Sequence, residues 1–191
     1  MAVGSYWPDH LLTLDDWDAL PEDNSRYYEL AEGVLIASPR PPSRHQRTAL
    51  RLCTQIEPQL PCGYSVLMQS EVVVDHGHPP TVRVPDVLVG PTADIDANLP
   101  RWNAGDLLLA VEVLADGTRR TDRRAKFFEY AAAGIRHYWL VDLEPVGLTV
   151  YQLNDGDYEL AAIGSGAVTS QLAGTPITID LPALTSSRAG R

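Results

Sequence analysis

Residues 107–114, "LLLAVEVL", constrain the fold most, because seven apolar residues there enclose a single carboxylate, Glu112. Side chains alternate between the two faces of a strand, so Glu112 shares a face with Leu108, Ala110 and Leu114, and the opposite face is equally apolar. A strand that is apolar on both faces is normally covered on both faces. An unpaired carboxylate there costs several kcal/mol, so Glu112 needs a partner.

The 191-residue chain is long enough for one domain, 1–191, with a core that folds unaided. Its hydrophobic content of 45% and charged content of 21% are typical of globular proteins. No run approaches the roughly 18 apolar residues of a membrane span, and the N-terminus lacks the pattern of a signal peptide. The two cysteines, Cys53 and Cys62, fit no disulfide framework. We therefore expect a cytoplasmic protein that does not bind membranes.

Helices and strands alternate along the chain. A helix is predicted from Ser43, which can cap it, to about Glu57, because Pro58 disfavours helical geometry in the residue before it. A second helix is predicted over 121–133, with Gly134 as its left-handed stop. The apolar positions of the first helix are Ala49, Leu50, Cys53 and Ile56.

Strand patterns cover most of the remaining chain. A hairpin over 27–38 is expected to turn at Glu32-Gly33. Further strands are predicted at "YSVLMQSEVVVD", "VRVPDVLVG", "DLLLAVEVL" and "HYWLVD". A C-terminal β-meander is expected from "GLTVYQL", "YELAAI" and "TPITID". These elements predict an α/β fold with a mixed sheet.

A second carboxylate, Asp86, opens the strand that precedes Glu112. If the two strands pair antiparallel across residues 91–105, Asp86 lies beside Glu112. Two acids so close repel each other, and Mg²⁺ is commonly held by one or two carboxylates together with waters and substrate phosphate. Two alternatives compete with a metal site: a Pro-Asp pair often simply opens a strand, and an arginine could neutralise a buried glutamate.

The chain contains fourteen arginines but a single lysine, Lys126, in the second predicted helix. Lysine is a compact point charge that can approach a water or a scissile phosphate, whereas arginine is a planar fork. The alternative is an ordinary i,i+4 pair with Asp122, worth a few tenths of a kcal/mol. Glu29 and His45 are weaker candidates for the same cleft.

The net charge of −10 argues against a generic nucleic-acid binder. However, ten of the 15 basic residues fall within 37–51 and 115–136. These stretches are either solvated helix faces or a local basic rim. The candidate phosphate contacts are Arg40, Arg44, Arg47, Arg119, Arg120 and Arg123.

Four segments in order, "RYYELAEGVLIASPRPPSRHQ", "VPDVLVG", "LLLAVEVL" and "TRRTDRRAKFFEYAAAGIRHYWLVD", closely resemble the Uma family of putative restriction endonucleases. That family belongs to the PD-(D/E)xK nuclease superfamily. The resemblance runs from about residue 12 to 151. It implies a restriction-endonuclease-like mixed sheet flanked by helices, and a site that cleaves phosphodiester bonds with Mg²⁺, or with Mn²⁺ in its place.

The resemblance also implies roles for individual residues. Asp86 and Glu112 match the two acids of the motif and would be metal ligands, with the Val113 carbonyl as a third candidate. The superfamily usually places its lysine two residues after the second acid, where this chain has Leu114. The family supplies it from the following helix, which matches Lys126. Glu29 and His45 match family positions of accessory residues.

Our hypothesis is therefore a metal-dependent endonuclease that acts on nucleic acid, with DNA as the expected substrate and a homodimer as a possible assembly. The competing hypothesis is a nuclease-fold binding or interaction module that cleaves nothing. The charge of −10 and the missing in-strand lysine favour that alternative.

Overall fold

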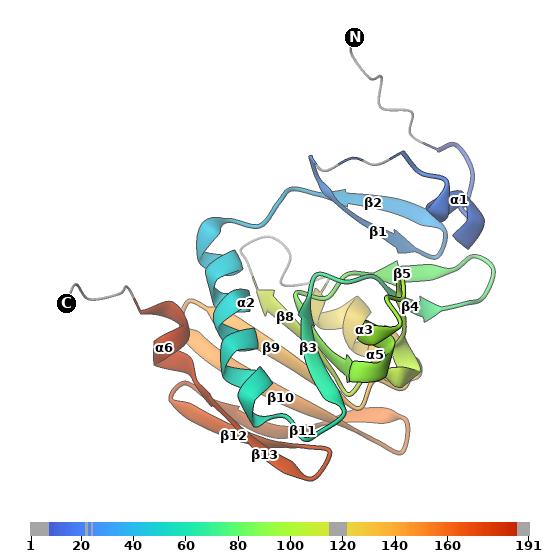
Figure 1. Cartoon of the computed structure of the whole chain (residues 1–191). Helices are drawn as coiled ribbons and strands as arrows, with labels where there is room; N and C mark the ends of the chain where they lie inside the picture. Colours follow the sequence, from blue (N-terminus) through green and yellow to red (C-terminus); the bar gives the residue numbers. More distant parts are fainter. Residues whose placement is uncertain (1–7, 22, 24, 115–121, 187–191) are drawn as a thin grey trace.

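The computed structural model describes residues 8–21, 23, 25–114 and 122–186. Within these residues the strands form a five-stranded, a six-stranded and a two-stranded sheet, with few and mostly short helices (Figure 1). The predicted mixed α/β fold is confirmed. None of the helices in the described ranges is both long and apolar enough to span a bilayer.

The five-stranded sheet contains the N-terminal hairpin and has the order β2-β1-β5-β4-β7. The predicted hairpin is confirmed, with Leu30 opposite Leu35 and Gly33 in the left-handed region that its turn requires. A short helix, α1 (Leu14–Asp18), precedes it. The strands are β1 (Tyr27–Ala31), β2 (Val34–Ser38), β4 (Val72–Asp75), β5 (Thr81–Arg83) and β7 (Trp102–Asn103).

The six-stranded sheet is the centre of the molecule and has the order β11-β10-β9-β8-β6-β3. Its β8 and β9 are parallel, and its other neighbouring strands are antiparallel. The strands are β3 (Tyr64–Met68), β6 (Val87–Pro91), β8 (Leu109–Leu114), β9 (His137–Leu143), β10 (Val146–Asn154) and β11 (Asp157–Gly164). The segment "LLLAVEVL" is thus central, as expected, and every residue of β8 is buried.

Two of the predicted strands are in fact two strands each. Residues 64–75 divide into β3 and β4, and residues 82–90 divide into β5 and β6, with one half in each large sheet. The first break contains Gln69 with a positive φ, and the second contains Pro85, which cannot donate to a ladder. Asp86 therefore lies where the chain passes from one sheet to the other.

Helix α2 (Ser43–Ile56) covers one face of the six-stranded sheet, as Figure 1 shows. Its buried residues Ala49, Leu52 and Ile56 pack in one cluster with residues of β6, β8 and β9. The prediction that Leu50 belongs to the apolar face is wrong, because its side chain is 58% exposed and Leu52 lies inside instead. Ser43 is the first helical residue and not the cap. A 3₁₀ turn, η1 (Glu57–Gln59), follows.

The opposite face of this sheet is covered by α5 (Phe127–Ala132). A π-helical turn, η3 (Asp122–Lys126), precedes α5, so the predicted helix over 121–133 is largely confirmed but irregular at its start. Tyr130 packs with residues of β8 and β9, and Gly134 has the predicted positive φ. Two short elements between β6 and β8 are α3 (Thr92–Asp96) and η2 (Ala104–Asp106).

The C-terminal strands are divided between two sheets. β10 and β11 extend the six-stranded sheet, whereas β12 (Ala167–Leu172) and β13 (Thr175–Asp180) form a separate hairpin. The sequence did not predict β12, in which only Val168 and Leu172 are buried. The last helix, α6 (Leu181–Thr185), packs against α2.

Candidate active site

The register of β6 against β8 brings the predicted acid pair together. Val87 lies opposite Val111 in an antiparallel ladder, and one further step sets Asp86 beside Glu112. In agreement, Oδ2 of Asp86 accepts a hydrogen bond of 2.7 Å from the backbone N–H of Val113. The predicted antiparallel pairing is therefore confirmed, and the side chain of Asp86 reaches the end of β8.

Glu112 is 4% exposed and has charged and neutral partners. Its Oε1 accepts hydrogen bonds from Nζ of Lys126 at 2.9 Å and from the hydroxyl of Tyr130 at 3.0 Å. Burial, and secondarily the charge of Glu112, raise the pKa of Tyr130 well above its ordinary value, so this phenol remains a donor. Among the described residues, the buried glutamate is thus compensated by the only lysine.

Lys126 is itself buried and contacts a second carboxylate. Its Nζ lies 3.0 Å from Oε1 of Glu29, which comes from β1 in the other large sheet. Lys126 is the last residue of the π-helical turn, a form of backbone that is frequent at functional sites. The side chain of Asp122, the alternative partner predicted for Lys126, lies outside the described residues.

Glu29 is held by further donors besides Lys126. Its Oε1 accepts from the backbone N–H of Val84 at 3.1 Å, and its Oε2 accepts from Nη1 of Arg83 at 3.2 Å. Burial alone would raise the pKa of Glu29, but Lys126 and Arg83 together hold it below its ordinary value. Glu29 is therefore an ionised and well-anchored carboxylate beside Lys126.

Arg83 was not predicted as part of this site. It is 3% exposed and donates to both carboxylate oxygens of Glu129, at 2.8 Å and 2.6 Å. Burial alone would lower the pKa of Arg83, but the hydrogen bonds to Glu129 and the charge of Glu29 raise it above its ordinary value. The signal that could have found it is a charge in the otherwise apolar run "TVRV", the same anomaly that drew attention to Glu112.

Asp86 has a different environment, in which no described arginine or lysine contacts its side chain. Besides the N–H of Val113, its Oδ2 contacts Nε2 of His45 at 3.1 Å. His45 is buried in the first turn of α2, and its Nδ1 has no hydrogen-bond partner within the described residues. The other oxygen of Asp86, Oδ1, also forms no hydrogen bond within that part of the chain. The structure thus brings His45 to the acid pair.

These side chains carry more negative than positive charge. Among the described residues of the site the carboxylates are Glu29, Asp86, Glu112 and Glu129, and the cations are Arg83 and Lys126. The excess of two negative charges would suit one divalent cation. No group of three or more His, Cys, Asp or Glu side chains in the described ranges has the arrangement of a metal site. An ion here would therefore complete its coordination with waters and substrate, as Mg²⁺ commonly does.

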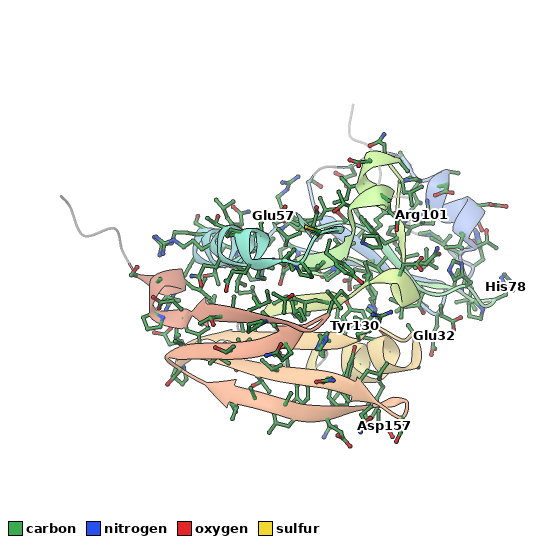
Figure 2. The ribbon with its side chains drawn as sticks, turned by 60° about the horizontal axis from the view of Figure 1, so that its bottom comes forward. Glu32, Glu57, His78, Arg101, Tyr130 and Asp157 are labelled. Carbon is green, nitrogen blue, oxygen red and sulfur yellow. The ribbon has the colours of Figure 1, made fainter. Side chains whose placement is uncertain are left out.

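Figure 2 shows where this region lies in the molecule. Tyr130, the partner of Glu112, is labelled in the interior, whereas His78 and Asp157 lie at the rim. His78 belongs to the "DHGH" loop, in which Oδ1 of Asp75 accepts from the N–H of Gly77. Residues 75–78 of this loop are exposed.

The predicted phosphate contacts have mixed surroundings. Arg44 donates to the carbonyl of Leu143, and Arg47 donates to the carbonyl of Thr185 in α6. Arg40 lies over the ring of Tyr27. All three are on the exposed surface, so their partners leave part of each side chain in contact with solvent. Arg119, Arg120 and the side chain of Arg123 lie outside the described residues.

Comparison with known proteins identifies the family. The model of the Uma2 family, described as "Putative restriction endonuclease", matches residues 14–183. The chain belongs to this family. Among solved structures, a putative nuclease belonging to DUF820 from Anabaena variabilis ATCC 29413 is similar, with a TM-score of 0.63 and 19% identity. The match covers 78% of this chain and 83% of that one, and it supports the same fold. No curated protein matches the sequence.

Proposed function

We propose that this member of the Uma2 family is a Mg²⁺-dependent endonuclease that hydrolyses phosphodiester bonds of DNA. The observation that carries the proposal is the contact of 2.9 Å between Nζ of the only lysine and Oε1 of Glu112, next to Asp86. An acid pair beside a buried ammonium is an arrangement that can bind a divalent ion and stabilise charge on a phosphate.

The residues present fit such an ion. Asp86 and Glu112 would hold it, with the Val113 carbonyl as a third candidate, and it would offset the excess of two negative charges among the described side chains of the site. Oδ2 of Asp86 is occupied by Val113 and His45, which leaves Oδ1 for coordination. When bound, Mg²⁺ activates a water and neutralises phosphate charge, and Mn²⁺ can supply the same chemistry.

The protein's own groups would act around this centre. Lys126 places a positive point charge where it can orient the attacking water or meet the negative charge that develops on the phosphate. Tyr130 donates to Oε1 of Glu112 and fixes that carboxylate. Because the groups around Lys126 and Glu112 are buried, their charges act in a medium of low dielectric constant, where each is worth more than in water.

Substrate binding would rely on local positive charge in an acidic protein. Arg40, Arg44 and Arg47 precede or lie in the first turns of α2, the helix that also places His45 beside Asp86. We propose that these three arginines, together with Arg119, Arg120 and Arg123, contact the phosphates of the DNA backbone. We further propose a homodimer, which would supply two sites for cutting two strands. We also propose a cytoplasmic location, where DNA and Mg²⁺ are both present.

The test is calorimetric titration of Mg²⁺ into the wild-type protein and into Glu112→Gln, which keeps the shape of the side chain but not its charge. We expect binding by the wild type and at least a tenfold weaker affinity in the variant. Glu57→Gln, which changes a carboxylate on η1 outside the site, is the matched control. Equal affinities in wild type and Glu112→Gln would overturn the metal role.

A second candidate function is a nuclease-fold module that binds a partner and cleaves nothing. It is favoured by the compensation of Glu112 by Lys126 and Tyr130, because this part of the site is stable without an ion. A plasmid-nicking assay with Mg²⁺ or Mn²⁺ separates the two functions. Nicking by the wild type and loss in folded Lys126→Met supports the enzyme, whereas no nicking by either protein supports the module.

A further inference from the structure

Glu29 is the one carboxylate at the site that comes from the N-terminal hairpin. It lies on β1 in the five-stranded sheet, whereas Glu112 lies on β8 in the six-stranded sheet. Nζ of Lys126 lies 3.0 Å from Oε1 of Glu29 and 2.9 Å from Oε1 of Glu112. The ammonium of Lys126 thus joins the two sheets at the point where the chain crosses between them.

The anchoring of Glu29 differs from that of an ordinary surface glutamate. The backbone N–H of Val84 and the guanidinium of Arg83 hold its two oxygens. Arg83 is in turn fixed by two hydrogen bonds to Glu129, so it cannot turn away from Glu29 without breaking a bidentate pair. Glu29 is therefore a rigid acceptor, although it stands on a hairpin far from the acid pair in sequence.

Lysine needs such an acceptor, because its flexible side chain has high rotamer entropy and its ammonium has no preferred direction. We propose that Glu29 is the positioning residue of Lys126: it holds the ammonium beside Glu112 and keeps it there when Glu112 turns its charge toward a bound ion. The N-terminal hairpin is then part of the active unit. This proposal rests on the proposed function and assigns a role to Glu29 within it.

The chain offers a matched pair of variants for this idea. Glu29→Gln removes the charge that contacts Lys126 and weakens one partner of Arg83. Glu129→Gln weakens the other partner of Arg83, and the contacts of Glu129 are with Arg83 rather than with Lys126. A purely structural role of this cluster predicts similar consequences for both variants, whereas a positioning role predicts that only Glu29→Gln alters Lys126.

Lys126 can be observed directly because it is the only lysine in the chain. Protein labelled with ¹⁵N at the lysine side chain gives one Lys126 ammonium signal by NMR, without any need for catalysis. We expect this signal to persist in the wild type and in Glu129→Gln, and to shift or be lost through fast exchange with water in Glu29→Gln. An unchanged signal in Glu29→Gln would overturn the proposal.

The kinetic readout is the separation of kcat from KM in the nicking assay. Glu29→Gln should lower kcat about 10- to 100-fold with little change in KM, because supporting residues of a metal site typically have effects of that size. Glu129→Gln should lower kcat clearly less than Glu29→Gln does, because Glu129 contacts Arg83 and not Lys126, whereas Glu57→Gln, outside the site, should keep the kcat of the wild type. Equal losses of kcat in the two variants would also overturn the proposal.

If Glu29→Gln does not fold, Glu29→Asp replaces it, because it keeps the charge and withdraws the carboxylate from Lys126 by one methylene. The same shift of the ammonium signal is expected, and its absence would count against the proposal. A wild-type protein that cleaves no nucleic acid overturns the proposed nuclease function and leaves the NMR result to decide the role of Glu29.

Discussion

The two faces of the six-stranded sheet differ in how completely their buried polar groups are paired. On the face covered by α5, the buried polar groups include the charges of Glu112 and Lys126 and the hydroxyl of Tyr130, and each of these three has a partner. On the face covered by α2, ring nitrogens of His45, His137 and Trp139 lack partners within the described residues. An unpaired ring nitrogen costs far less than an unpaired charge, so full charges are buried only where they are compensated.

The largest expected effect comes from breaking the compensation on the α5 face. Lys126→Met leaves the buried Glu112 and the half-buried Glu29 without the cation that they share, and we expect the free energy of unfolding to fall by about 3–5 kcal/mol. Urea unfolding followed by circular dichroism measures it. In the double variant Lys126→Met/Glu112→Leu much of this loss should be recovered, because the uncompensated charge is gone. A loss below about 1 kcal/mol in the single variant would contradict the contrast between the faces.

On the α2 face we expect the free energy of unfolding to depend on pH, through the titration of His137. Burial, with a smaller effect of Arg136, lowers the pKa of His137 from its ordinary 6.5 to about 4. The unfolded chain therefore takes up a proton before the folded protein does as the pH falls. Stability from this group is complete above about pH 6.5 and decreases by about 3 kcal/mol down to pH 4.

The measurement is the free energy of unfolding at several pH values, for the wild type and for His137→Gln. The variant should lose most of the slope between pH 6.5 and 4. Glu29 acts in a separate window: its pKa lies below its ordinary 4.5, so its stabilisation is present above that pH and is lost only at more acidic values. An unchanged slope in His137→Gln would show that other groups control the acid sensitivity.

The smallest expected effect on stability is at Asp86, which lies at the boundary between the two faces. Asp86→Asn keeps an oxygen for the N–H of Val113 and loses only the charge, so we expect a change of about 1 kcal/mol. Mg²⁺ affinity, measured by calorimetry, should nevertheless fall. Asp75→Asn in the exposed loop is the control, and equal Mg²⁺ affinities in the two variants would argue against Asp86 as a ligand.

The register of Asp86 and Glu112 could be predicted from the sequence because it depends on strand alternation and on the antiparallel pairing of two strands that neighbour each other in one sheet. The anchoring of Lys126 by Glu29 could not, since it depends on how two sheets meet. Residues 82–90 are rich in valine on both sides of Pro85, so the sequence predicted a single strand and not the division between β5 and β6 that places Arg83 beside Glu29.

Three further features of the structure were not predicted, or were predicted only weakly, from the sequence. Two concern the fold and one concerns the site, and their physical reasons are similar. Leu50 and Leu52 both continue an apolar pattern on α2, and only the direction of the neighbouring sheet decides that Leu52 is inside. In β12 only Val168 and Leu172 are buried, so too few apolar residues mark the strand for the sequence to distinguish it from a loop. The sequence indicated His45 only weakly, because its contact with Asp86 depends on how α2 packs against the sheet. No local pattern in the sequence reveals that packing.

The burial of the only lysine has a practical consequence for proteolysis. A protease that cuts after lysine has a single target bond in the whole chain, between Lys126 and Phe127, and Lys126 is 6% exposed in the folded state. Cleavage therefore requires the start of α5 to separate from the sheet. When this opening is fast relative to cutting, the cleavage rate reports the population of the open form. The rate of this single cut then reports how often the start of α5 separates from the sheet.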